Sequence, residues 1–302
     1  MWHKLAAWLK SYYRRRYQTP VKQHMTPSTP LASAVKDIAC AQKTTFATTQ
    51  AVWRFLNHDL IAFSQLNQLL ITLAQQGIAS RPHCCALVVH DWSRLQFFSH
   101  RGKRHRLQMT HATDVGYERQ SRLRVDAASG LPVVPLAQTL TDNLTRHSTF
   151  SDDTGEKQTH LDALTADIFR IEALDVGKTR VHLIDREGDS IAHMRELDSR
   201  SLRWLIRGKE GHRVEYQGRS RKLGEVADEL AFTKVKQVDY KGKKAHLSLS
   251  ETAVNITRAA KPKRIDNETG RRVKVVPGNA LTVKLVVARR DDDAGQMLCR
   301  WT

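Results

Sequence analysis

The residues of this chain that could do chemistry are a group of carboxylates. Asp185, Glu187 and Asp189 stand within five positions in the stretch HLIDREGDS, and Asp91 stands in VVHDWSRL. Carboxylate oxygens are hard ligands that suit Mg²⁺ or Mn²⁺. Two such ions about 3.5–4 Å apart can clamp the attacking and the leaving oxygen of a phosphodiester. The residue types therefore indicate metal-dependent phosphoryl transfer.

Two strands would have to bring these carboxylates together. CCALVVHD is typical of a buried strand that ends at Asp91, and TRVHLID of a second strand that ends at Asp185. In open sheets, active groups collect at the carboxyl ends of parallel strands. If the two strands are adjacent and parallel, we expect Asp91 and Asp185 to meet although they are far apart in the sequence.

Each carboxylate also has a purely structural interpretation. An Asp after a strand commonly caps the following turn, so Asp91 could do no more than that, and Asp185 could cap the turn into the next helix. Glu187 and Asp189 could be surface acids, one of them paired with Arg186. Composition and spacing alone leave these alternatives open.

The charge of the chain points to a polyanionic partner. Its 302 residues include 49 Lys and Arg against 31 Asp and Glu, which gives a net charge of +18. Neutralised phosphates release counterions, so nucleic acid is favoured over a membrane surface as the partner. The basic tracts at 101–106, 219–222, 241–244 and 261–264 could each contact phosphate or could be solvated loops.

The sequence argues against a membrane-spanning or secreted protein and against a protein stabilised by disulfides. No segment reaches the ~18 apolar residues that a membrane span needs, and the start of the chain does not read as a secretory signal. The cysteines, Cys40, Cys84, Cys85 and Cys299, form no CxxC pair, so neither a disulfide framework nor a structural zinc site is expected. We therefore predict a protein of the reducing cytoplasm.

Residues 1–80 are predicted to form an N-terminal helical DNA-binding region. Residues 1–20 read as a basic amphipathic helix that places Trp2 and Trp8 on one face. That helix could pack on the body of the protein or serve as a basic arm for DNA. Residues 31–76 read as further helices after a Pro-rich linker.

The rest of the chain is predicted to be α/β, with a mixed-sheet core and then a β-rich region. Residues 81–208 contain strand-like runs around a helix at 159–174. From 209 to 302 the sequence alternates apolar and polar residues and is rich in Val, Thr and Lys. This pattern indicates antiparallel β structure with one wet, basic face.

Three stretches resemble the bacterial insertion-sequence transposases that have a DDE catalytic core. DREGD at 185–189, followed by RWLIRGKEG, resembles the second catalytic segment of the branch typified by transposon five and insertion sequence four. VVHDWSRLQF resembles the first segment, with Asp91 in the place of the first aspartate. TTQAVWRFLNHDLIAFSQL resembles the helical region before the core. The likeness covers most of residues 31–302.

This resemblance implies an RNase H-like fold, incomplete at its C-terminus, and an inserted β domain at 209–302. It implies cut-and-paste transposition of double-stranded DNA, at element ends and target, by a protein located at the bacterial nucleoid that dimerises when complete. Two Mg²⁺ or Mn²⁺ ions are expected. Site roles carry over to six residues: Asp91 and Asp185 as catalytic metal ligands, Arg207 and Lys209 on phosphates, Arg186 ordering the pocket at the DNA, and Trp301 stacking on a displaced base.

One departure from the family concerns the third carboxylate. In the family it lies on a helix patterned Y-x-x-R-x-x-x-E-x-x-x-x-x-x-K, which nothing here matches, and Asp291, Asp292 and Asp293 are predicted to lie in a turn. The chain is therefore expected to be truncated and poorly active or inactive alone. Two other classes stay open: a non-catalytic DNA-binding protein that interferes with an intact transposase, and an RNase H-like nuclease unrelated to transposition.

Overall fold

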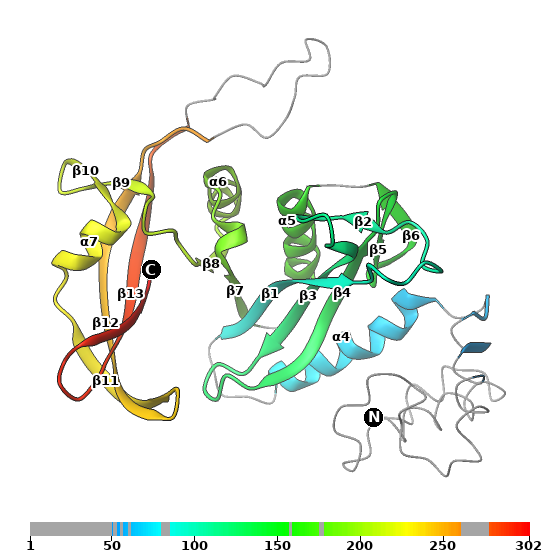
Figure 1. Ribbon diagram of the computed structural model, residues 1–302, viewed down its shortest axis with the longest axis horizontal. Helices are drawn as coiled ribbons and strands as arrows, with labels where there is room; N and C mark the ends of the chain where they lie inside the picture. Colours follow the sequence, from blue (N-terminus) through cyan, green and yellow to red (C-terminus); the bar gives the residue numbers. More distant parts are fainter. Residues whose placement is uncertain are drawn as a thin grey trace. The chain divides into compact units, whose positions relative to one another are not determined.

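The computed structural model describes residues 50, 53–54, 57–59, 62–79, 85–156, 159–174, 178–260 and 278–302 (Figure 1). The predicted helix at 1–20 and the tract at 261–264 lie outside these residues. The chain divides into two compact units, and strands β1, β3 and β4 each run from one unit into the other. The predicted boundaries at 80 and 208 stay predictions.

The first sheet is mixed and has eight strands. Their order is β6-β5-β4-β3-β1-β7-β8, with β2 pairing with β3. The strands are β1 (Cys85–Gln96), β2 (Leu107–Gln108), β3 (Val115–Val125), β4 (Pro132–Thr141), β5 (Thr145–Ser148), β6 (Ser151–Glu156), β7 (Thr179–Ile184) and β8 (Arg203–Ile206). β1 pairs in parallel with β7, and β7 pairs in parallel with β8.

Strand β1 is longer than the sequence predicted. The expected strand ending at Asp91 continues to Gln96, so Asp91 lies in mid-strand. The reason is that β1 has two neighbours: its pairing with β7 stops at His90, while β3 is hydrogen-bonded along its other edge. The Phe97 N–H still donates to the Val115 carbonyl, 2.8 Å away, just beyond the end of the strand.

The helices of the fold are short, apart from α4. They are α4 (Phe63–Ala79), α5 (His160–Glu172), α6 (Ile191–Ser199) and α7 (Leu223–Glu229), with a 3₁₀ turn η3 (Arg186–Gly188) after β7. The helix predicted at 159–174 is confirmed as α5. Its N-terminus is capped by Thr159, whose hydroxyl accepts the Asp162 N–H at 3.3 Å. None of the described helices is both long and apolar enough to cross a membrane.

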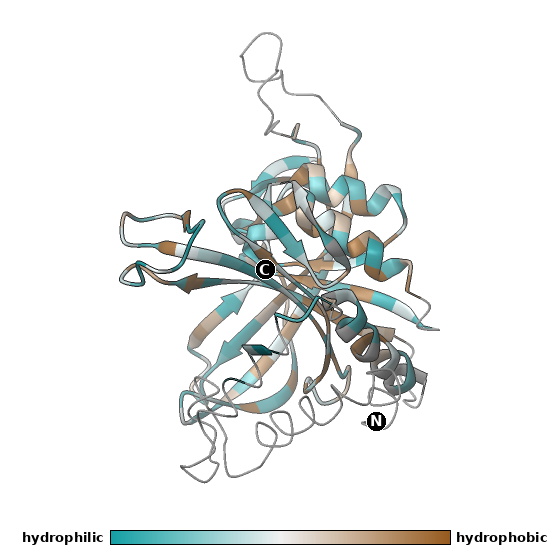
Figure 2. Ribbon diagram, turned by 90° about the vertical axis from the view of Figure 1, so that its right-hand side faces the viewer, coloured by the Kyte–Doolittle hydropathy of each residue, from teal (hydrophilic) through white to brown (hydrophobic). Residues whose placement is uncertain are grey.

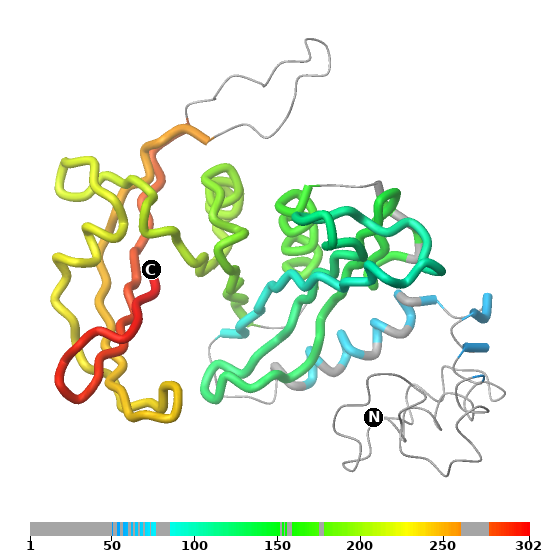
Figure 3. Tube along the Cα trace, in the orientation of Figure 1, coloured from blue at the N-terminus to red at the C-terminus, as the bar shows by residue number. Residues whose placement is uncertain are grey.

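The second sheet is antiparallel in the pairings of its described strands, as the alternating sequence after residue 208 indicated. Its order is β10-β9-β12-β13-β14, with β11 pairing with β12. Its strands are β9 (Arg213–Tyr216), β10 (Arg219–Lys222), β11 (Thr233–Tyr240), β12 (Lys243–Ile256), β13 (Leu281–Asp291) and β14 (Met297–Trp301). Figure 3 follows the chain from β8 into these strands, with β14 at the red end beside β13.

The mixed sheet buries many polar side chains. From Glu118 onward, the alternate buried residues of β3 and the residue that follows it are all polar: Glu118, Gln120, Arg122, Arg124 and Asp126. Figure 2 shows hydrophilic residues interspersed with hydrophobic ones along the strands. Arg122 forms an ion pair with Asp167 of α5, and the two side chains are 1% and 0% exposed. A strand of this composition would normally be assigned to the surface, so only the packing reveals this interior.

Candidate functional site

The register of β1 and β7 brings Asp91 and Asp185 together. The pairing runs in parallel from Cys85 opposite Thr179 to His90 opposite Ile184. Asp91 and Asp185 are therefore the next residues on the two neighbouring strands. Both side chains are exposed, and both line one cavity of about 530 Å³. Adjacent, parallel strands were the condition for this meeting, and that condition holds.

Asp185 also caps the turn that follows it. Its Oδ1 accepts the Glu187 N–H at 2.9 Å, and Asp185 is the N-cap of η3. A Cβ at Gly188 would lie 2.3 Å from Cγ2 of Ile184, so the turn packs tightly on the end of β7. Capping and metal binding are compatible, because a carboxylate has two oxygens and Oδ2 has no protein partner among the described residues.

Asp91 has a simpler environment. The Ser93 hydroxyl donates to its Oδ2 at 3.2 Å. Asp91 does not cap a turn, since β1 continues past it. The capping interpretation of Asp91 is therefore wrong.

The other two acids of DREGD differ sharply from each other. Glu187 is half exposed and lies 3.8 Å from His160 Nδ1. The side chain of Asp189 is only 2% exposed, and its Oδ2 is 2.9 Å from His212 Nδ1. Asp189 is thus no surface acid. Among the described residues Arg186 forms no ion pair, so the predicted pairing with Glu187 or Asp189 is not present.

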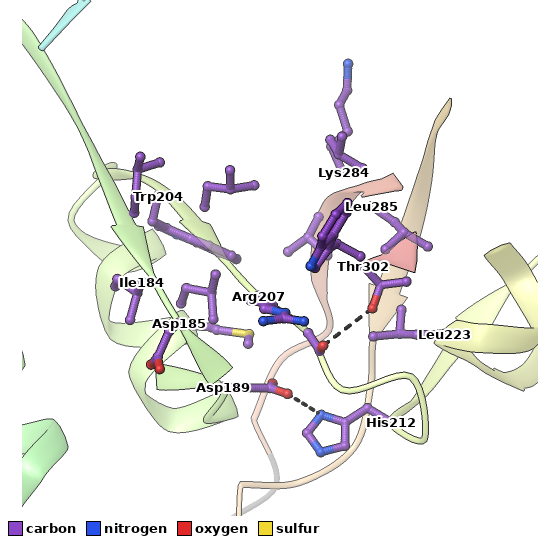
Figure 4. Close-up of a pocket in the computed structure, with 18 of the residues that line it drawn as sticks. Ile184, Asp185, Asp189, Trp204, Arg207, His212, Leu223, Lys284, Leu285 and Thr302 are labelled. Carbon is purple, nitrogen blue, oxygen red and sulfur yellow. Dashed lines mark hydrogen bonds and ion pairs between the residues drawn. The ribbon is translucent and has the colours of Figure 1, made fainter. Parts of the chain in front are cut away.

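Arg207 and Lys209 follow β8 instead of lying on it, because β8 ends at Ile206. The Arg207 N–H donates to the Ile184 carbonyl at 3.0 Å, which anchors it beside Asp185. Both side chains are exposed. Figure 4 shows Arg207, Asp185 and Asp189 around the same pocket. The two cations are therefore placed beside the aspartates by backbone contacts.

Trp301 lies on β14, opposite Ala288 of β13. β14 belongs to the second sheet. The Arg290 guanidinium carbon lies 4.6 Å from the centroid of the Trp301 ring. Trp301 nevertheless lines the same cavity as Asp91 and Asp185.

Asp291 and its neighbours do not supply a third carboxylate. Asp291 is the last residue of β13, so the predicted turn is wrong for Asp291, whereas Asp293 does lie in the turn that follows. The Asp291 carboxylate lies 3.0 Å from Arg289 Nε. Within the described ranges, no group of three or more His, Cys, Asp or Glu side chains could hold a metal ion. Mg²⁺ is often held by one or two carboxylates together with water and substrate phosphates, so a pair of aspartates is not incompatible with it.

A buried hydrogen-bond chain lies behind the aspartates. His90 Nε2 and His182 Nδ1 are 2.8 Å apart, and His182 Nε2 is 2.8 Å from Glu172 Oε1. Arg180 donates to the other oxygen of Glu172 at 2.7 Å. Sequence reasoning missed this chain, although period-2 alternation puts His90 and His182 on the inward face of their strands.

Burial and hydrogen bonding determine which side chains of this hydrogen-bond chain are charged. Burial is the main cause that holds the pKa of His90 well below its usual value, and His182, Arg122 and His193 add to it. Burial raises the pKa of Glu172, but hydrogen bonds from His182 and Arg180 outweigh it and lower that pKa to about 2. A neutral His90 and an ionised Glu172 therefore stand on either side of His182.

Comparison with known proteins identifies no family for this chain. No family model matches the sequence, and no curated protein matches it. One solved structure that matches is the cryo-EM structure of a piggyBac transposase synaptic complex with hairpin DNA. The TM-score is 0.31 at 12% sequence identity, over 86% of this chain and 53% of that chain. This chain thus spans about half the length of the solved one, and so low a score identifies no family.

Proposed function

We propose that this chain is a DNA transposase of the bacterial insertion-sequence type, with an RNase H-like DDE core. The observation that carries the proposal is the parallel register of β1 and β7, which makes Asp91 and Asp185 neighbours at one cavity. A carboxylate on one strand and a carboxylate directly after the adjacent parallel strand are an arrangement that suits metal-dependent phosphoryl transfer. The strand order β4-β3-β1-β7-β8 supports an RNase H-like core, because β1 and the parallel β7 are central and adjacent.

In this proposal Asp91 and Asp185 hold Mg²⁺ or Mn²⁺, which would make a water or a 3′-hydroxyl a competent nucleophile and stabilise the leaving oxygen. Arg207 and Lys209 contact DNA phosphates beside the aspartates. Trp301 contacts a DNA base at the cavity. The net charge of +18 provides the long-range attraction to double-stranded DNA.

The site has only two of the three carboxylates of a DDE core among the described residues. We therefore expect this chain to bind metal and DNA but to cut DNA poorly alone. The same observation favours the second candidate, a DNA-binding protein without catalytic activity. We further propose a dimer that acts on paired element ends and a location at the nucleoid.

The proposal is tested first by metal binding. Mn²⁺ is titrated into the whole chain and followed by electron paramagnetic resonance, for the wild type and for Asp91→Asn and Asp185→Asn. Each substitution should weaken Mn²⁺ binding by at least about tenfold, because even the loss of a group that only orients a metal ligand costs that much. Asp239→Asn, at an exposed position on β11 outside the cavity, is the control and should leave binding unchanged.

The second measurement separates the two candidates. Duplex DNA is incubated with the protein and Mn²⁺, and both binding and nicking are followed. Nicking that disappears in Asp91→Asn and Asp185→Asn supports the enzyme. DNA binding without nicking, unchanged in both variants, favours the non-catalytic protein. Equal Mn²⁺ binding by all variants would show that the aspartates are not ligands and would overturn the proposal.

A further inference from the structure

Asp189 has a buried carboxylate to which the proposed function assigns no role. It ends the turn that begins at Asp185, and one of its oxygens, Oδ2, has two partners. The Lys209 N–H donates to it at 3.0 Å, and His212 Nδ1 lies 2.9 Å away. Figure 4 shows the Asp189 carboxylate directed at His212, away from Asp185. These partners point to a role in holding the 207–212 loop.

Backbone contacts hold this loop near both of its ends. The Arg207 N–H donates to Ile184 at the end of β7, and the Gly208 N–H donates to the Thr302 carbonyl at 2.8 Å. The His212 N–H closes the loop on the Lys209 carbonyl at 2.8 Å. The Lys209 N–H is the donor in the middle of the loop, and only the Asp189 side chain accepts it among the described residues.

His212 lies near the end of β12 as well. Arg258 Nη2 lies 2.7 Å from the same Nδ1 atom, which at any one time either donates to Asp189 or accepts from Arg258. Arg195 of α6 donates to the Arg258 carbonyl at 3.1 Å. Burial is the largest cause that lowers the pKa of His212; Asp189 raises that pKa, while Arg258 and Lys209 lower it. Asp189 therefore supplies the carboxylate of a junction that is otherwise made of cationic and neutral groups.

A hydrogen-bonded turn connects Asp185 to Asp189. The Gly188 N–H donates to the Asp185 carbonyl at 3.1 Å, and the missing Cβ of Gly188 lets the turn pack on Ile184. A loop tied to Asp189 is thus tied to Asp185 as well. The side chains of Arg207 and Lys209 extend from that loop.

We propose that Asp189 is a positioning residue: it binds the Lys209 N–H and His212 so that Arg207 and Lys209 stay beside Asp185, where DNA phosphate must lie. This inference rests on the proposed function. It assigns different roles to the three acids of DREGD, with Asp185 as a ligand, Asp189 as the anchor of the loop, and Glu187 as an exposed residue with neither role. Asp189 is not a metal ligand in this scheme.

Three variants of the whole chain test the proposal. Asp189→Ala removes the acceptor of the Lys209 N–H. Asp189→Asn keeps a side-chain carbonyl oxygen that can accept this bond and removes the charge. Glu187→Gln, two residues away and half exposed, is the matched control. Thermal unfolding establishes that each variant is folded.

Amide hydrogen exchange followed by mass spectrometry measures how well the 207–212 loop is held. In Asp189→Ala, exchange in peptides covering 207–212 should rise by about tenfold, because a charge-assisted hydrogen bond is removed. Exchange in β7 should not change. Asp189→Asn and Glu187→Gln should stay within about threefold of the wild type. An unchanged loop in Asp189→Ala, or an equal rise in β7, overturns the proposal.

Binding to a random-sequence DNA duplex tests whether Arg207 and Lys209 still contact phosphates in each variant. The dependence of log affinity on log salt should become shallower in Asp189→Ala by about one for each phosphate that the variant no longer neutralises, so by up to about two. Asp189→Asn should keep the wild-type slope, and this rescue by the conservative variant separates positioning of the loop from the charge itself. Identical slopes in all variants overturn the proposal.

Mn²⁺ titration distinguishes this inference from the proposed function. Asp189→Asn should bind Mn²⁺ like the wild type, whereas Asp185→Asn should not. Loss of Mn²⁺ binding in Asp189→Asn would make Asp189 a ligand and overturn the inference. If the wild type itself bound no Mn²⁺, the proposed function would fail, while the exchange experiment would still report whether Asp189 holds the loop.

Discussion

The two sheets of this protein bury different kinds of side chain, although strands β7 and β8 of the first sheet and β12 and β13 of the second contribute to one apolar cluster. Around the second sheet the apolar cluster includes Val226 and Ala227 of α7 with Val254, Leu285 and Val287 of the strands, while Ser248 and Asp291 are the buried polar residues of its described strands. The mixed sheet instead buries a row of charged and amide side chains on β3, together with His90, His182, His193 and Asp167. Buried apolar side chains stabilise the folded state without directional contacts. Buried polar side chains destabilise it unless they are hydrogen-bonded or ion-paired.

The polar interior lies directly behind the candidate site. His90 precedes Asp91, and its partner His182 lies on β7 three residues before Asp185. A hydrogen bond has a narrow range of distance and angle, so it penalises a shifted register more than an apolar contact does. Hydrogen bonds between buried side chains of β1 and β7 therefore restrict the register that places Asp91 beside Asp185.

The largest expected effect comes from breaking the ion pair inside the mixed sheet. Arg122→Met should lower the free energy of unfolding by about 3–5 kcal/mol, because it leaves the carboxylate of Asp167 buried without that partner. Urea unfolding followed by circular dichroism measures the loss. The double variant Arg122→Met with Asp167→Leu should recover more than half of it. A double variant no more stable than Arg122→Met would contradict the idea that the unpaired charge is the cost.

Truncation of an apolar residue in the second sheet should have a smaller effect. Leu285→Ala should cost about 2–3 kcal/mol, near the low end for such changes, because Leu285 already borders the cavity. Its neighbour Lys284 is 63% exposed and pairs with Glu251 at the surface, so Lys284→Ala should change stability by less than about 0.5 kcal/mol. Equal losses in the two variants would mean that this interior is not the source of stability.

The hydrogen-bond chain behind the site should give the mixed sheet a distinct pH dependence. Glu172→Gln should cost about 2 kcal/mol at neutral pH, because His182 and Arg180 lose a charged partner. The folded pKa of Glu172 is about 2, below its usual value of 4.5, so its contribution is present above pH 4.5 and is lost as the pH falls toward 2.

The free energy of unfolding, measured between pH 7 and pH 2, tests this direction of the pH dependence. The difference between the wild type and Glu172→Gln should be constant above pH 4.5 and should close below it. Leu285→Ala should show no such convergence. A gap that stayed constant down to pH 2 would remove Glu172 as the source.

The smallest effect on stability is expected at the site itself. Asp185→Asn should change the free energy of unfolding by less than about 0.5 kcal/mol, since Asn caps a helical turn as well as Asp does. The same substitution should abolish most Mn²⁺ binding. Thermal unfolding and metal titration on one sample test both statements. A loss of stability as large as that of Arg122→Met would place Asp185 among the structural residues.

Much of the fold could be predicted from local pattern. The apolar runs of β1 and β7 and the helix α5 were readable, because each has an apolar pattern of its own. The end of β1 was not readable, since its continuation past Asp91 depends on pairing with β3. The placement of Arg207 and Lys209 after β8 likewise depends on where β7 ends.

The sequence by itself determined the chemistry that is available: carboxylates after two apolar runs, a net charge of +18, and small or capping residues at the turns. The tertiary structure decided which acids serve which purpose. Asp185 and Asp189 look alike in DREGD, yet one is exposed beside Asp91 and the other is buried against Lys209 and His212. Burial and pairing are properties of contacts between distant residues, and no local pattern specifies them.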